Sequence, residues 1–190
     1  KNPKSNGEKM IHIMFETFNV PSFYLGIQNV LSLYAAGRIT GIVCEIGDGV
    51  TSVVPVIDGY CLPKNIKRID FGGSDITTFL QENLSSNGVT HRNREIFRDI
   101  KEKCGYVALD FEAELEKAKT SSECDAKYTR PDGEVIPLAK ERFLCPELLF
   151  KPQMFNFEHD GIDKMIFDTI METDYAKELF SSIILSGGSS

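Results

Sequence analysis

Three expected strands of this sequence run into glycine-containing turns: EIGDGVT over residues 45–51, DFGGSD over residues 70–75 and LSGGSS over residues 185–190. Glycine lets backbone N–H groups approach an anion closely because no Cβ intervenes, and ligands of α/β folds bind at strand ends. A tight hairpin explains any one of these turns as well, since Asp-Gly is the commonest hairpin turn. Each turn therefore has two interpretations, a simple connection or part of an anion site.

The first turn adds two carboxylates, Glu45 and Asp48, at one strand end. A hairpin whose N–H groups grip phosphate oxygens can use Asp48 to hold Mg²⁺, directly or through water, because Mg²⁺ keeps much of its hydration shell. Glu45 is expected at the same end of the sheet. This interpretation explains why a strand carries charge at its tip, and the glycines that flank Asp48 leave room for phosphates.

The order of the expected elements indicates an α/β fold. Residues 7–18 have helical periodicity, and residues 22–37 predict a second helix so apolar all round that we expect it to be buried. A strand meander with a tight turn at Asp58-Gly59 follows. The later expected elements are a helix over 74–88, one or two helices over 91–119, a hairpin around 131–133, helices over 161–174 and 175–182, and a short buried strand over 183–188. Helices inserted between two sheet segments predict a smaller subdomain within this architecture.

Composition excludes several classes of protein. The formal net charge is -7 and the basic residues do not gather in one run, so we expect no nucleic-acid partner. The five cysteines are odd in number and lack CxxC spacing, which indicates free thiols in a reducing compartment, and the three histidines lie too far apart to predict a zinc site. No apolar stretch approaches the ~18 residues of a membrane span, and the N-terminus has no signal-peptide pattern. We therefore expect a cytoplasmic protein without direct membrane binding.

Several long runs of the sequence resemble the actin family. They are EKMIHIMFETFNVPSFYLGIQNVLSLYAAGRITGIV, GDGVTSVVP, REIFRDIKEKCGYVALDFE, PDGEVI, ERFLCPELLF and ILSGGSS. The resemblance runs from end to end, with small gaps around SSNGVTHRN and METDYAKE, and covers the central half of an actin chain. It implies the actin-like ATPase fold of the actin, sugar kinase and heat-shock chaperone superfamily, in incomplete form. By this resemblance residues 1–35 are the end of the first large subdomain, 36–72 and 158–190 form the second large subdomain, and 73–157 form the inserted smaller one.

The resemblance also implies an ATP site, residue by residue. Gly47, Asp48, Gly49 and Val50 match the second phosphate hairpin, with Asp48 and Glu45 near the hydrated cation. Gly73 matches an adenosine contact, and Arg98, Lys101 and Glu102 match the adenine and ribose pocket. Gly187 and Gly188 match the third nucleotide loop, and Gln28 matches the glutamine that orients the attacking water. Each assignment has a structural alternative. The alternative for Gln28 is a hydrogen bond within a surface where helices pack. The alternative for Arg98, Lys101 and Glu102 is a solvated helix face on which charges pair at i, i+4 spacing.

Three residues depart from the family pattern. Glu45 stands where actin has an aspartate near the cation, Ile46 replaces a serine that can meet the terminal phosphate, and Ser52 replaces a histidine that helps to place the water. A longer carboxylate shifts the cation, and the loss of the histidine removes a group that orients water or relays a proton. The sequence therefore supports nucleotide binding more strongly than hydrolysis. It does not decide whether the protein is an ATP hydrolase.

Two functions follow from these observations. The first is a cytoskeletal actin-like protein of the cytoplasm that binds ATP or ADP with Mg²⁺ or Ca²⁺, assembles with itself into filaments, hydrolyses ATP slowly and meets actin-binding proteins. The alternative is a non-polymerising actin-related scaffold that holds nucleotide as a structural ligand. A sugar kinase or heat-shock ATPase would not share the long matches in the middle of the chain. The expected contact surfaces are an apolar segment, QMFNFEH, with Met154, Phe155 and Phe157, and a docking groove around Tyr34, Gly37, Ile39 and Tyr60.

Overall fold

The computed structural model describes residues 3–89 and 93–190. Within them, five strands form a mixed sheet in the order β3-β2-β1-β7, with β4 also paired to β2. The strands are β1 (Gly41–Ile46), β2 (Thr51–Ile57), β3 (Tyr60–Cys61), β4 (Lys67–Ile69) and β7 (Ile183–Ser186). β1 is antiparallel to β2 and parallel to β7. This parallel pair brings the first and third glycine turns to the same edge of the sheet.

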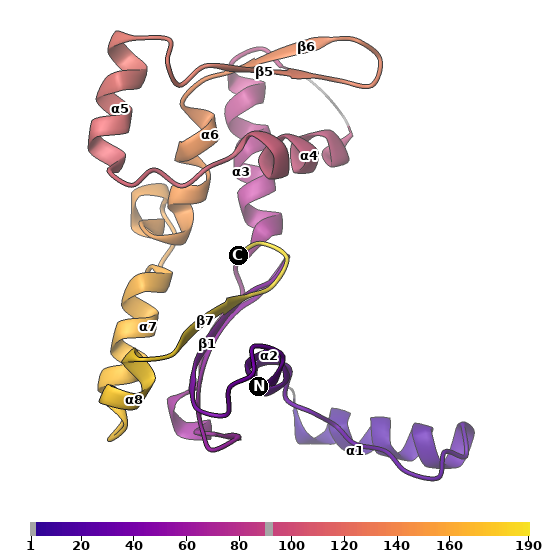
Figure 1. Ribbon diagram of the computed structural model, residues 1–190. Helices are drawn as coiled ribbons and strands as arrows, with labels where there is room; N and C mark the ends of the chain where they lie inside the picture. The colour runs from indigo at the N-terminus through magenta and orange to yellow at the C-terminus, as the bar shows by residue number, and fades with distance from the viewer. Residues whose placement is uncertain (1–2, 90–92) are drawn as a thin grey trace.

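Helices cover both faces of this sheet (Figure 1). α2 (Gln28–Ala35) packs on one face, where Val30 and Leu33 meet Val43, Val54 and Val56 in a small buried cluster. α7 (Ile162–Met171) and α8 (Ala176–Phe180) cover the other face, against Ile42, Cys44 and Ile46. Successive residues of β1 therefore alternate between two cores, as the period of a buried strand requires.

The chain between β4 and α7 forms the upper part of the molecule in Figure 1. Its elements are α3 (Gly73–Ser86), α4 (Arg94–Cys104), α5 (Phe111–Thr120), the hairpin β5 (Ala126–Thr129) and β6 (Val135–Leu138), α6 (Glu141–Leu144), and two 3₁₀ turns, Pro146–Leu149 and Pro152–Phe155. α3 and α4 pack on each other, and their buried residues, such as Leu80 and Phe97, belong to the same core cluster as Ile42 of the sheet. The insertion is thus held to the sheet by continuous apolar packing.

Both predicted hairpins are confirmed. Asp58 and Gly59 have φ values of 49° and 82°, the left-handed pair that a two-residue turn between twisted strands needs. The second hairpin pairs Thr129 with Val135 and leaves Pro131-Asp132-Gly133 at its tip. The predicted helix over 74–88 is confirmed as α3. Within the described part of the range 91–119, the helical pattern corresponds to α4 and α5, and residues 91 and 92 lie outside the described residues.

The expected buried helix over residues 22–37 is wrong in extent and in burial. Residues 22–27 are not helical, and α2 begins only at Gln28. Gly26 explains part of the difference, because glycine within a helix costs about 1 kcal/mol relative to alanine. Only three residues of α2 are buried, and Tyr24 is 82% exposed. The helix before this segment, α1 (Lys4–His12), continues as a π-helical turn over Ile13–Thr17 and points away from the sheet (Figure 1).

The strand predicted over residues 183–188 exists as β7, but it is not buried. Ile183 and Leu185 are 45% and 59% exposed. The physical reason is its position, because β7 pairs with β1 on one side and ends the strand order on the other. All five cysteines are unpaired, as predicted. None of the helices in the two described ranges is long and apolar enough to cross a membrane.

Candidate functional site

The three glycine turns meet at one place in the structure. Gly73 N donates to Gly47 O at 3.0 Å, and Ser74 N donates to Asp48 O at 2.6 Å. From the third turn, Ser189 N donates to Ile46 O at 3.0 Å. We call residues 46–50, 72–74 and 187–189 the three-turn junction. These three bonds join backbone groups of the different turns.

Close approach explains two glycines of the three-turn junction. A Cβ on Gly72 would lie 2.5 Å from Gly47 O and 2.7 Å from Asp48 O, which is closer than Cβ atoms come to backbone oxygen. Gly187 has a φ of +100°, and a Cβ there would meet Ile46 O. Gly49 and Gly188 differ, because a Cβ on either would meet nothing within 4 Å. Packing therefore requires the first pair, whereas the second pair faces open space.

Lys101 joins this junction from α4. The side chain of Asn93 caps α4 by accepting from Glu95 N at 3.0 Å, and Lys101 lies two turns later. Its Nζ donates to Gly73 O at 2.9 Å. Burial lowers the pKa of Lys101, and the nearby charges of Glu102 and, to a smaller extent, Asp48 oppose that shift. The junction thus includes one half-buried amine, where a phosphate would find positive charge.

The other two predicted charges of α4 form ion pairs on its surface. Arg98 contacts Glu95 at 2.8 Å and Glu102 at 3.7 Å, and both Arg98 and Glu102 have 55% of their side chains exposed. This is the i, i+4 pairing that the structural alternative expected. Glu102 and Lys101 nevertheless both line a cavity next to the junction, which is described below, and Arg98 does not line it. The structure therefore brings Lys101 and Glu102 towards the junction, but not Arg98.

A cavity of about 380 Å³ adjoins the three-turn junction. That volume is within the range of small-molecule sites. Most of its lining is apolar, and Lys101, Glu102 and Ser189 are among its polar residues. The lining residues are Ile46, Ile76, Lys101, Glu102, Gly105, Tyr106, Val107, Pro146, Leu149, Phe150, Ile162, Leu185, Gly188, Ser189 and Ser190. The sequence did not single out Ile76, Tyr106 or Phe150, because apolar residues there are indistinguishable from core.

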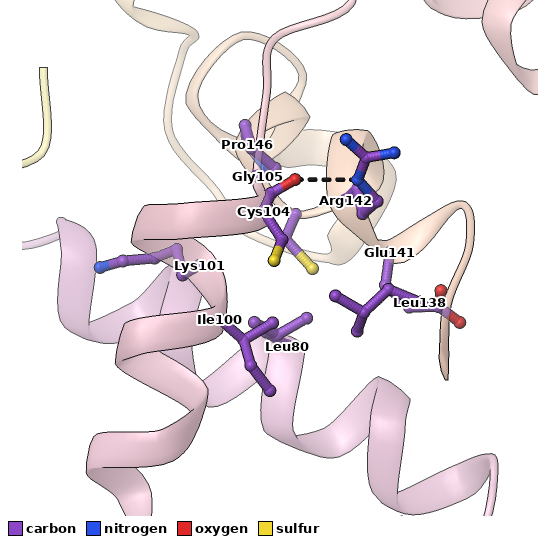
Figure 2. A pocket seen from close by; sticks show the side chains of 10 residues that line it. Leu80, Ile100, Lys101, Cys104, Gly105, Leu138, Glu141, Arg142 and Pro146 are labelled. Atoms are coloured by element: carbon purple, nitrogen blue, oxygen red, sulfur yellow. Dashed lines mark hydrogen bonds between the residues drawn. The ribbon is translucent and has the colours of Figure 1, made fainter. Parts of the chain in front are cut away.

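A second cavity on the other side of Lys101 holds no ligand-sized space. Its volume is about 10 Å³, far below that of small-molecule sites. Figure 2 shows the Lys101 amine extending away from it, while Arg142 closes the opposite side by donating from Nε to Cys104 O at 2.9 Å. The larger cavity at the three-turn junction is therefore the candidate binding site.

Gln28, the predicted water-orienting residue, lies at the start of α2 beside the strand ends. Its Nε2 donates to Glu45 Oε1, and partial burial raises the pKa of the Glu45 carboxyl group. The next residue, Asn29, is buried and donates from Nδ2 to Ser52 Oγ at 3.1 Å. Asn29 was not predicted. Glu45 and Ser52 face each other across β1 and β2.

Two carboxylates are available for a divalent cation at this end of the sheet. Asp48 is exposed at the tip of the first turn, and Glu45 is half-buried one strand position before Ile46. Carboxylate oxygens are the ligands that Mg²⁺ and Ca²⁺ prefer. Within the described residues, no group of three or more His, Cys, Asp or Glu is placed to hold a metal ion by itself. The donor set therefore fits a cation that phosphate oxygens and water also ligate.

In a comparison with protein families, the family model described as actin matches the chain over residues 1–190. The matched range includes all three glycine turns, α4 and Gln28. The individual site residues remain predictions.

Proposed function

We propose, because this chain belongs to the actin family, that the three-turn junction binds ATP or ADP together with Mg²⁺ or Ca²⁺. The mixed sheet with its inserted helices is the actin-like ATPase fold. The observation that carries the proposal is the convergence of three turns and the Lys101 amine beside a cavity of about 380 Å³.

Each part of the site has a separate task in this proposal. Gly49 and Gly188 leave space at the turn tips, so that phosphate oxygens reach backbone N–H groups. Lys101 supplies positive charge, and the apolar part of the cavity receives the base and sugar. Asp48 and Glu45 would hold the cation, which supplies charge neutralisation during phosphoryl transfer. Gln28 and Ser52 lie beside the turn that carries Asp48, where they orient a water.

Slow ATP hydrolysis coupled to filament assembly is the function that we favour. Release of phosphate from Mg-ATP by the full-length protein, measured as protein concentration rises and combined with sedimentation, tests it. Release that increases with polymer supports an assembling ATPase. The Asp48→Asn variant, which keeps size but removes the carboxylate charge, is expected to weaken Mg-ATP binding. Absence of ATP binding by the unmodified protein would overturn the proposal.

The alternative function is a scaffold that retains nucleotide without turnover. The contact between Gln28 and Glu45 favours it, because an amide held by a carboxylate is not free to orient water. Ile46 and Ser52 favour it as well, since neither supplies the group that the family pattern has there. Tight retention of ATP with neither phosphate release nor polymer would identify the scaffold.

Assembly and partner binding remain part of the proposal. Tyr60 is 79% exposed and Ile39 60% exposed, as a docking groove would need. In the apolar segment, Met154 is exposed, whereas Phe155 packs on Phe79 and Phe157 packs on Phe71. Filament contacts through this segment would therefore use Met154 first. The division into subdomains at residues 35, 72 and 157, and a cytoplasmic, cytoskeletal location, are likewise proposals.

A further inference from the structure

Four polar side chains connect the start of α2 to the ends of β1 and β2. Gln28 donates to Glu45 on β1, and the adjacent Asn29 donates to Ser52 on β2 at 3.1 Å. Glu45 and Ser52 are cross-strand partners, so the two bonds lie side by side. Both donors are amides of one helical turn, and both acceptors are on the sheet. Asn29 is only 7% exposed, which makes it the more buried of the two donors.

The direction of the second bond decides what Ser52 can do. A side-chain amide N–H only donates, so the Ser52 oxygen acts as the acceptor towards Asn29. A hydroxyl group has one proton, and that proton is then left for an acceptor other than Asn29. A serine without such a neighbour would rotate its proton freely. Asn29 therefore fixes Ser52 as a hydrogen-bond donor.

Space for an acceptor exists next to Ser52. A cavity of about 560 Å³ is bordered by Gln28, Asn29, Val50, Ser52 and Arg68, together with apolar residues of the segment before α2. Val50 belongs to the three-turn junction, so this cavity reaches the turn that carries Asp48. Gln28 and Arg68 are also on its wall, where Gln28 donates to Glu45 and Arg68 donates to Asp70. An occupant with oxygen lone pairs, such as water or phosphate, can accept the remaining Ser52 proton.

We propose that Asn29 is a positioning residue for ATP hydrolysis, which acts by turning the Ser52 hydroxyl proton towards the attacking water or the terminal phosphate. This inference rests on the proposed nucleotide site. In this inference the pair Asn29 and Ser52 orients the water. Ser52 itself stands where the family pattern has a histidine. Asn29 touches neither substrate nor cation in this proposal.

The test is steady-state phosphate release from Mg-ATP by the full-length protein, with kcat and KM determined separately. The variants are Asn29→Ala, Asn29→Asp, Ser52→Ala, the Asn29→Ala/Ser52→Ala double variant and Ser52→Thr. Loss of one oriented donor is expected to lower kcat about tenfold with KM within about twofold of the unmodified protein. Ser52→Thr restores the hydroxyl and is expected to recover at least about half of kcat.

Asn29→Asp separates orientation from packing. Aspartate has the size of asparagine and can keep a bond to Ser52, but it accepts the Ser52 proton and so reverses the bond. We expect kcat of Asn29→Asp to fall as far as that of Asn29→Ala, and the double variant to be no slower than either single variant. Thermal unfolding of each variant, measured in parallel, identifies any that fails to fold, and the Ser52 variants then carry the comparison.

Three results would overturn the inference. Asn29→Asp with unchanged kcat would mean that Asn29 only fills space. Additive losses in the double variant would mean that the two residues act separately. Tight ATP binding without phosphate release by the unmodified protein would remove the reaction that Asn29 serves and leave the nucleotide site in place. A protein that binds no ATP would instead overturn the proposed function itself.

Discussion

The two sides of the candidate site are built differently. At the three-turn junction, backbone groups contact backbone groups, and Gly72 is needed because a side chain would collide with Gly47 O. At the start of α2, side chains contact side chains, and Asn29 meets Ser52. Where backbones approach as closely as they do at Gly72, a side chain is excluded, whereas a side-chain pair such as Asn29 and Ser52 can be exchanged for another. We therefore expect substitutions at Gly72 to affect stability, and substitutions of the side-chain pair to affect chemistry.

The largest expected effect is on the backbone side. Gly72→Ala forces a Cβ against two carbonyl oxygens of the first turn, so we expect the free energy of unfolding to fall by about 3 kcal/mol and nucleotide affinity to fall with it. Gly49→Ala is the matched control, because its Cβ would meet nothing within 4 Å. Denaturant unfolding of both full-length variants measures the difference. Equal free energies of unfolding for the two variants would mean that the turns move apart at little cost. The proposed difference between the backbone side and the side-chain side of the site would then be wrong.

The next effect concerns Lys101, whose amine contacts the junction at Gly73 O. Lys101→Met removes a charge-assisted bond to Gly73 O and the positive charge beside the proposed phosphate site, so ATP affinity should fall about tenfold or more. Lys103→Met is the control two residues away, since Lys103 is 67% exposed and pairs with Asp99. Titration with a fluorescent ATP analogue compares them. Similar losses in both variants would show that overall charge, not the position of Lys101, supports binding.

The different pKa shifts of Lys101 and Lys103 lead us to expect that ATP affinity depends on pH. Burial lowers the pKa of Lys101, whereas the hydrogen bond to Asp99 raises the pKa of Lys103. As pH rises, Lys101 therefore loses its proton before an exposed lysine does, and binding that depends on its charge should weaken in that range. ATP affinity measured against pH in the unmodified protein and in Lys101→Arg checks this. Arginine keeps its charge, so the variant should show a flatter profile.

The difference between the two sides also explains what the sequence could predict. Glycines, hairpin turns and apolar strands are local signals, so β1, β2, α3 and both hairpins were predictable. The family resemblance adds Gly47 and Gly187 as predicted site residues. The bond between Asn29 and Ser52 joins residues 23 positions apart and has no local pattern. The exposure of Leu185 depends on where β7 lies in the strand order, which periodicity does not reveal. Likewise, Gly73 was predicted from the family motif, and an added Cβ there would meet the Ser189 and Lys101 side chains, whereas one on its neighbour Gly72 would meet backbone oxygens.

The smallest expected effect is at Arg98 on the surface of α4. It tests whether the side-chain part of the site extends along this helix. Arg98 is 55% exposed and paired with Glu95 and Glu102, and exposed ion pairs contribute about 1 kcal/mol or less. If these contacts persist when nucleotide binds, Arg98→Ala should change the free energy of unfolding by about 0.5 kcal/mol and ATP affinity by less than about threefold. The same titration used for Lys101 measures it. A loss as large as that of Lys101→Met would mean that Arg98 leaves its carboxylate partners to contact the ligand, and would extend the site along α4 as the family resemblance implies.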